Sequence, residues 1–162
     1  MRNLILKQIH NESLKSLSPS LENINNKILL TSIDESSNSI ILFTSDLKIY
    51  LIEYSFLSPS ILKYEIELDS SLCDYSDLML SLMDKLEKKT NPFLSIFYKA
   101  EVETIILVLK SGELFSIPTN DQKSKLITNL CDKKINNEII AIEISSNQEY
   151  IVAVLSNFKI IT

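Results

Sequence analysis

The stretch TIILVLKSGELFSIP, residues 104–118, consists of two apolar runs joined by the polar turn Lys110-Ser111-Gly112. It holds the only glycine among the 162 residues. Glycine adopts a positive φ without a Cβ clash, which many hairpin turns require. The stretch therefore predicts a β-hairpin with a positive φ at Gly112. A single glycine also excludes the glycine-rich loops that cradle nucleotide phosphates.

The same strand–turn–strand pattern occurs three times without gaps. The copies are IILFTSDLKIYLI at 40–52, IILVLKSGELFSI at 105–117 and IVAVLSNFKIIT at 151–162. Their turns centre on Asp46-Leu47, Ser111-Gly112 and Asn157-Phe158. In the two copies without glycine, Asp or Asn stands one position earlier, and these residue types also tolerate turn geometry. The three hairpins are predicted to be copies of one structural unit.

The copies begin at residues 40, 105 and 151, so they lie 65 and 46 residues apart. The second spacing is close to the period of about 40–45 residues for four-stranded propeller blades. Each hairpin also follows a further apolar strand, as in AIEISSNQEYIVAV. We therefore expect an all-β fold, an incomplete WD40-like β-propeller comprising the first two to three blades. An unrelated sandwich or barrel, which also has many evenly spaced short strands, is the alternative.

The predicted strands share a high content of Ile, Val, Leu, Tyr and Phe and are bounded by Ser, Asn, Asp and Pro. They are Asn3–Gln8, Lys27–Ile33, Ser39–Thr44, Lys48–Glu53, Ile61–Leu68, Pro92–Tyr98, Glu103–Leu109, Glu113–Ile117, Lys125–Leu130, Glu138–Ile144, Glu149–Leu155 and Phe158–Thr162. Alternation in Ile61–Leu68 predicts a half-buried strand. The continuous runs IILVL and IVAVL predict strands covered on both faces.

One segment, DYSDLMLSLMDKLEKK at about 74–89, has helical periodicity instead. It places Met79, Leu82, Met83 and Leu86 along one face. Ser76 is the expected N-cap, and acidic residues at the start and lysines at the end suit the helix dipole. This short helical insertion accounts for most of the longer first spacing. We expect the apolar face of this helix to pack on the chain's own sheet. Docking of a partner protein on that face is the alternative.

A closed propeller has typically about 4–8 blades, each buried against its neighbours. This chain supplies a first partial blade and about two more. We therefore expect residues 1–162 to be the N-terminal blades of a longer β-propeller domain, and to expose apolar blade faces when alone.

The net charge of −5 and a pI near 4.9 argue against direct binding of nucleic acid, which requires clustered basic residues. Lys85, Lys88 and Lys89 do cluster, at the expected end of a solvated helix. Cys73 and Cys131 form no CxxC motif, so a reducing compartment is expected. No apolar run is long enough for a signal peptide core or a membrane span. The expectation is a soluble, cytoplasmic protein.

The residues offer little for catalysis. His10 is the only histidine, so paired-histidine metal motifs are excluded, and no nucleophile signature accompanies it. Four acidic residues, Asp69, Asp74, Asp77 and Glu87, are read as a solvated loop and helix face rather than an acid–base pair. The aromatic residues Tyr50, Tyr54, Tyr64, Phe97 and Phe115 are expected in the core. We predict no enzyme and no catalytic, cofactor-binding or metal-binding residue, and no cofactor.

Taken in order, three segments resemble one known family. These are Met1-Arg2-Asn3-Leu4 before an apolar strand, the turn Lys110-Ser111-Gly112-Glu113-Leu114, and EIIAIEISSNQEYIVAVLSNFKIIT at 138–162. They resemble the N-terminal blades of the largest subunit of the Elongator complex. The helical segment at 74–89 and the scarcity of glycine depart from that family's pattern, and residues 9–26 match nothing in it.

The resemblance implies tandem WD40-type propellers and a helical-repeat region in the full-length subunit. It also implies a scaffold and dimer platform in a complex that modifies the wobble uridine of transfer RNAs. The chemistry in that family belongs to a different, radical-SAM and acetyltransferase-like subunit. The implied partners are other Elongator-like subunits and a second copy of the full-length protein, in the cytoplasm and also the nucleus. The alternatives are an adaptor module of a trafficking or ubiquitin-ligase assembly, and a hydrolase that uses His10.

Overall fold

The computed structural model describes residues 27–54, 60–68, 72–120, 123–131, 137–145 and 150–161. The fold is all-β and propeller-like, with three antiparallel sheets and one α-helix of ordinary length in the part described. The expected strand Asn3–Gln8, the candidate residues His10 and Asp69, and the Met1–Leu4 segment lie outside the described residues.

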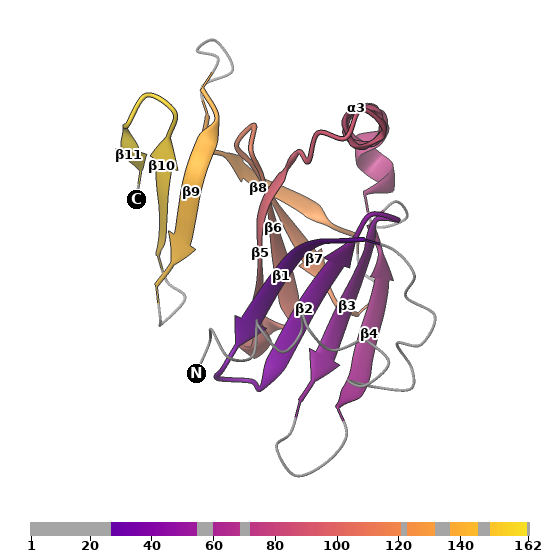
Figure 1. Cartoon of the computed structure of the whole chain (residues 1–162). Coiled ribbons are helices and arrows are strands. Elements are labelled where there is room, and N and C mark those ends of the chain that lie inside the picture. The colour runs from indigo at the N-terminus through magenta and orange to yellow at the C-terminus, as the bar shows by residue number, and fades with distance from the viewer. Residues whose placement is uncertain are drawn as a thin grey trace.

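Each sheet is a meander in which consecutive strands pair (Figure 1). Blade 1 consists of β1 (Ile28–Asp34), β2 (Ser39–Thr44), β3 (Lys48–Glu53) and β4 (Ile61–Glu67). Blade 2 consists of β5 (Phe93–Lys99), β6 (Thr104–Leu109), β7 (Glu113–Pro118) and β8 (Lys125–Asn129). Blade 3 consists of β9 (Ile139–Ile144), β10 (Ile151–Leu155) and β11 (Ile160–Ile161). These bounds agree with the predicted strands to within about two residues at most ends.

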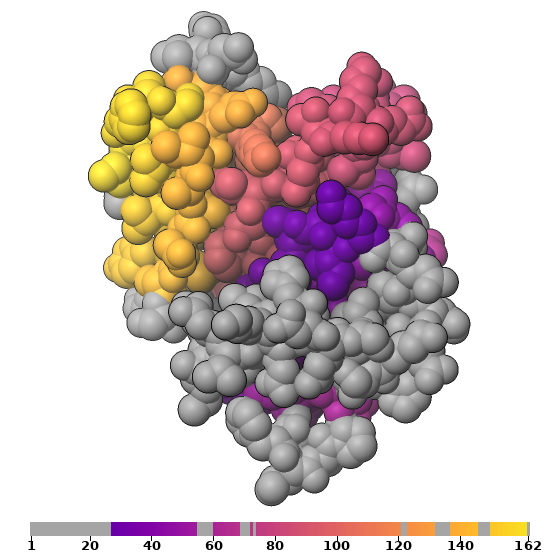
Figure 2. Space-filling model, viewed as in Figure 1, coloured from indigo at the N-terminus to yellow at the C-terminus, as the bar shows by residue number. Residues whose placement is uncertain are grey.

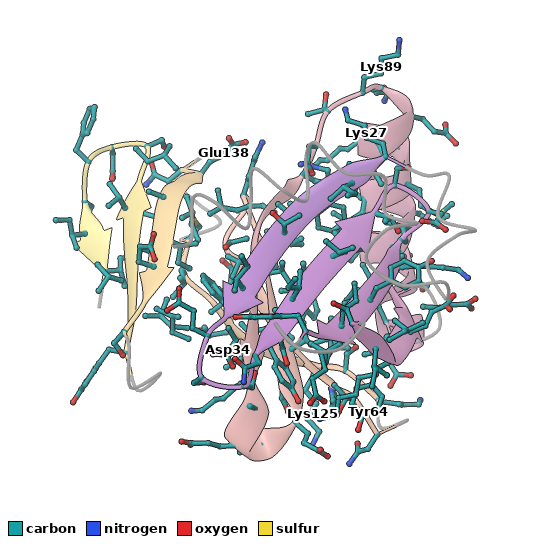
Figure 3. The ribbon with its side chains drawn as sticks, turned by 60° about the horizontal axis from the view of Figure 1, so that its bottom comes forward. Lys27, Asp34, Tyr64, Lys89, Lys125 and Glu138 are labelled. Carbon is teal, nitrogen blue, oxygen red and sulfur yellow. The ribbon has the colours of Figure 1, made fainter. Side chains whose placement is uncertain are left out.

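The first strands of the three blades, β1, β5 and β9, lie next to one another at the centre of the arrangement. Lys27 and Glu138, which precede β1 and β9, lie at the same end of the molecule, and Asp34 at the end of β1 lies opposite (Figure 3). The inner strands therefore run in the same direction. Blade 2 lies between blades 1 and 3 (Figures 1 and 2). Three meanders side by side around their first strands are the geometry of propeller blades, not of a two-sheet sandwich.

Two hydrophobic cores fill the spaces between neighbouring blades. The first joins blades 1 and 2 and includes Ile41, Phe43, Leu107 and Phe115. The second joins blades 2 and 3 and includes Val108, Leu114, Ile142 and Leu155. Strand β2 is buried along its whole length and β6 along all but its first residue. For β6, in the middle blade, this agrees with the prediction from the run IILVL, because both faces of the strand are covered. For β10 the prediction from the run IVAVL is wrong: Val152 is 39% exposed, because one face of blade 3 is open to solvent.

The central hairpins of the blades are equivalent at the level of single hydrogen bonds. In each turn a backbone N–H donates to the carbonyl three residues earlier: Leu47 to Thr44 at 3.0 Å, Gly112 to Leu109 at 3.0 Å and Phe158 to Leu155 at 2.8 Å. The three donors all have positive φ, of 61°, 104° and 62° respectively. A tight turn followed by one left-handed residue is a common three-residue hairpin loop. The prediction of a positive φ at Gly112 is confirmed.

The same equivalence extends to the neighbouring strand. The N–H groups of Ser45, Lys110 and Ser156 donate to the carbonyls of Lys27, Pro92 and Glu138, at 2.8, 2.9 and 2.8 Å. From blade 1 to blade 2 the donor and the acceptor each move 65 residues along the chain, and from blade 2 to blade 3 each moves 46, the same spacings as in the sequence repeat. The sequence repeat is therefore a repeat of backbone geometry.

The helical insertion forms η3 (Cys73–Tyr75) and α3 (Ser76–Glu87) between β4 and β5. Met79 and Leu82 are buried in the core between blades 1 and 2, and Tyr75, Leu78 and Leu86 pack against it. The helix thus packs on its own sheets, as favoured. Two details of the prediction are wrong. Tyr75, not Ser76, is the N-cap, because the preceding 3-10 turn shifts the helix start. Met83 is 44% exposed, because the inward face turns toward Leu78 instead.

Candidate interaction surfaces

A cavity of about 600 Å³ opens between the inner strands of the three blades. Blade 1 contributes the end of β1 and the turn after it, blade 2 the middle of β5, and blade 3 the end of β9. Its lining includes the hydroxyl residues Thr31, Ser32, Ser95 and Ser145, and the rings of Phe97 and Tyr98. The cavity follows directly from the geometry, since three parallel inner strands splay around a common centre.

The described residues that line this cavity carry a net negative charge. Asp34, Glu35 and Glu143 are among the described lining residues, and no Lys, Arg or His is. The carboxylate of Asp34 accepts hydrogen bonds from Ser36, through its N–H at 3.0 Å and its hydroxyl at 2.6 Å, and from the hydroxyl of Ser37 at 2.7 Å. Burial, reinforced by Glu103, raises the pKa of Tyr98, so its phenol stays protonated to higher pH than that of an exposed tyrosine. Such a lining disfavours phosphate groups and favours cationic ones.

The acidic residues considered for acid–base work do not come together as a site. Asp74 forms an ion pair with Lys123 at 2.8 Å. Asp77 and Glu87 lie at opposite ends of α3. Within the ranges that the structure describes, no group of three or more His, Cys, Asp or Glu residues is placed to hold a metal ion. The lysine cluster follows the helix as expected, with Lys88 paired to Asp84 at 2.6 Å.

Cys131 is a buried free cysteine beside the turn of Gly112. Burial raises the pKa of its thiol, and the carboxylates of Glu113 and Glu138 raise it further. The reactive form of cysteine is the thiolate, so this thiol is held in its unreactive state at neutral pH. Cys131 is a core residue rather than a nucleophile.

Blade 3 presents an apolar face to solvent. Register pairs Val154 with Ala141 on one side and Ile160 on the other, and paired residues share one face of a sheet. Val152 lies on the same face, next but one along β10. Glu143 pairs with Val152 and so shares this face. We call the set Ile140, Ala141, Glu143, Val152, Val154 and Ile160 the open face of blade 3. Figure 2 shows this blade (orange to yellow) as one outer side of the molecule.

Neither the cavity nor the open face was predicted residue by residue. The cavity gathers Ser32, Phe97 and Glu143, which are far apart in the chain and carry no shared motif. The aligned repeat does hold a signal for it, because these three residues occupy one equivalent position in the inner strands. The open face was foreseen only as a general exposure of blade surfaces.

No family model matches this chain, and no curated protein matches it. Among the helices that the structure describes, none is long and apolar enough to cross a membrane.

Proposed function

We propose that the chain is a non-catalytic scaffold segment that resembles the N-terminal blades of the Elongator largest subunit and supports modification of the wobble uridine in transfer RNA. The observation that carries the proposal is the residue-for-residue equivalence of the blades. In support of it, equivalent turn hydrogen bonds at Leu47, Gly112 and Phe158 accompany the Ser111-Gly112 hairpin of blade 2 and the described residues 138–145 and 150–161 of blade 3. That is the order on which the resemblance rests.

The physical properties of the blades suit a scaffold. Each blade is fixed to the next by a large apolar core, so its edges and loops keep a constant geometry from which partners can be held. Function on such folds is located at surfaces rather than in the sheet itself. The expected partners are other Elongator-like subunits and a second copy of the full-length protein, in the cytoplasm and also the nucleus. The net charge of −5 supports protein contacts over direct contact with nucleic acid.

Affinity purification of the tagged natural protein from its own cells tests the proposal. A radical-SAM and acetyltransferase-like subunit should be identified by mass spectrometry among the recovered proteins. Recovery of coat or ubiquitin-ligase subunits in its place would assign the chain to a different assembly and overturn the proposal. Leu107→Asp places a charge in the core between blades 1 and 2, so this variant is the matched control and should lose the specific partner.

A further inference from the structure

We propose that the cavity between the inner strands binds a basic peptide segment of a protein partner and receives one of its lysine or arginine side chains. The cavity has a volume of about 600 Å³ and is bordered by β1, β5 and β9. The proposal deepens the proposed function and rests on it only in that a scaffold binds other proteins. It adds where the partner binds and which chemical class of segment the cavity takes.

The backbone around the cavity is able to receive an extended chain. Within the described sheets, β1, β5 and β9 are each the inner strand of a blade and pair with one neighbouring strand only. Their other edges face the centre of the arrangement (Figure 1). A strand edge presents both N–H donors and C=O acceptors, and a peptide backbone carries both kinds of group. A free polyamine carries donors only, so a peptide is the better occupant.

Three carboxylates border the cavity without a cationic partner. They belong to Asp34 at the end of β1, Glu35 in the turn that follows, and Glu143 in β9. None of the three forms an ion pair in the part of the chain that the structure describes. By contrast, Asp74 and Glu65, which do not line the cavity, are each paired with a lysine. A cation placed among several like charges is attracted by each of them, so the lining selects a positively charged group.

The carboxylate of Asp34 is held in place by neutral groups. Its Oδ1 accepts hydrogen bonds from the N–H and the hydroxyl of Ser36, and its Oδ2 accepts one from the hydroxyl of Ser37. An ionised carboxylate has about four acceptor sites, so one site remains for a ligand. Neutral donors orient the group and leave its charge in place. A charged group oriented in advance loses less conformational freedom when a ligand binds.

The part of the wall that blade 2 supplies is aromatic. Phe97 and Tyr98 both line the cavity, and Phe97 is half-buried, so part of its surface stays accessible. Lysine and arginine have an apolar stem and a charged end, and their charged ends are attracted to the faces of aromatic rings. The stem of such a side chain can pack against Phe97 while its charged end reaches the carboxylates. A small inorganic cation would leave the apolar part of the wall without a contact.

The surface around the cavity extends the acidic character. The cavity lies toward the end of the molecule marked by Asp34 in Figure 3. At this end the turn after β5 adds Glu101 and Glu103, and Glu53 ends β3 beside the start of β2. Lys99, the last residue of β5, is also at this end but is not among the described lining residues. A segment with several basic residues is therefore favoured over one that carries a single basic residue among acidic ones.

Binding of defined peptides to the natural full-length protein tests the proposal. The probe is a short fluorescent peptide, blocked at both ends, with a central Arg-Lys-Arg among alanine and serine; its match has glutamine at the three basic positions. Fluorescence polarisation at about 0.15 M salt measures both affinities. The basic peptide should bind roughly tenfold more tightly than its match, since several carboxylates attract it at once.

Two double variants separate the cavity from the rest of the acidic surface. Glu35→Gln with Glu143→Gln removes two exposed charges that make no hydrogen bond in the described part of the chain, and should weaken binding of the basic peptide roughly fivefold. The matched control, Asp77→Asn with Glu87→Gln, removes two exposed charges from α3 and should change the affinity by less than about twofold. Glu35→Lys with Glu143→Lys should reverse the preference and favour a peptide with glutamate at the three positions.

Equal affinity of the basic and neutral peptides would overturn the proposal. An equal loss in the cavity and control variants would do the same, because that is the behaviour of diffuse attraction to an acidic surface. Displacement of the peptide by an equal concentration of spermidine would assign the cavity to a small polyamine instead. These results are independent of the purification experiment. Peptide binding without recovery of the radical-SAM subunit would keep the cavity assignment and remove the Elongator assignment, and the reverse result would remove the cavity assignment alone.

Discussion

At Gly112 the backbone has φ of 104°, and a Cβ placed there would lie 2.7 Å from both Asn129 Oδ1 and Cys131 Cβ and 2.8 Å from the backbone nitrogen of Cys131. Glycine is therefore required for two reasons, a left-handed backbone and a close approach of the chain that follows β8. Leu47 and Phe158 share only the first reason, so residues with a side chain stand at those two turns.

We predict that Gly112→Ala destabilises the protein by about 2 kcal/mol or more, because positive φ costs an alanine roughly 1–2 kcal/mol and the steric conflict adds to it. Urea unfolding monitored by circular dichroism measures the change. Ser111→Ala, one residue earlier, is the control and should cost less than about 1 kcal/mol. Equal stability of Gly112→Ala and wild type would show that the turn relaxes at no cost.

Phe158→Asn should have the opposite sign in the 162-residue chain. Asparagine tolerates the left-handed region better than phenylalanine does, and the exposed ring contributes little packing, so we expect a gain of about 0.5–1 kcal/mol. The thermal midpoint of unfolding provides the measurement. A lower midpoint would mean that the ring makes stabilising contacts at this exposed turn.

At the scale of elements, α3 covers one end of the core between blades 1 and 2 and also protects an edge. The hydroxyl of Tyr75 accepts a hydrogen bond from the N–H of Leu126 in β8 at 3.0 Å, and its ring packs edge-on against Phe115 at 5.3 Å. Strand β8 is the last strand of blade 2, and unpaired edge N–H groups invite association with other chains. The insertion therefore stabilises the sheet that it interrupts.

Leu82→Ala should destabilise the protein by about 2–5 kcal/mol, since Leu82 is almost completely buried and its removal leaves a cavity. Met83→Ala, the next position on the same helix, should cost about 1 kcal/mol or less, because Met83 is 44% exposed and is not part of the core. Chemical denaturation of the pair decides between the two faces. Similar losses for both variants would mean that the helix is rotated from the orientation described.

At the scale of the whole molecule, several groups bind their protons more tightly in the folded state. Burial raises the pKa of Tyr50, of Tyr98 and of Cys131. A hydrogen bond to Glu65, and then the charge of that carboxylate, raise the pKa of Lys48. Because each pKa is higher in the folded state than in the unfolded state, these contributions are fully present at neutral pH and are lost as the pH rises through the folded values.

We therefore predict that the free energy of unfolding falls steadily between about pH 9 and pH 11. Urea unfolding at about pH 7, 9, 10 and 11 tests this. Tyr50→Phe removes one of the titrating groups and should make the fall shallower. An identical slope in Tyr50→Phe would show that Tyr50 does not contribute.

The sequence was sufficient for the bounds of the strands that the structure describes, for the helix and for the blade period, because apolar patterns and turn residues are local signals. It was insufficient where the outcome depends on contacts between distant segments. The exposure of Met83 depends on how α3 packs against two blades. The positive φ of Leu47 and of Phe158 could not be predicted because the residues before them, an aspartate and an asparagine, are the ones that commonly adopt turn geometry. The cavity forms only where strands from three blades come together, so no local sequence pattern predicts that Ser32, Phe97 and Glu143 line the same space.

The meander order of every sheet also bears on how the protein forms during synthesis. Each strand pairs with the strand synthesised just before or just after it, so only a short loop must close for the two strands to pair. The resulting contact order is low, which favours rapid folding. A blade can therefore assemble as soon as its last strand leaves the ribosome, and each new blade covers the apolar face left by its predecessor. Translation from the N-terminus thus keeps at most one such face uncovered at a time, which limits the chance of aggregation of the nascent chain.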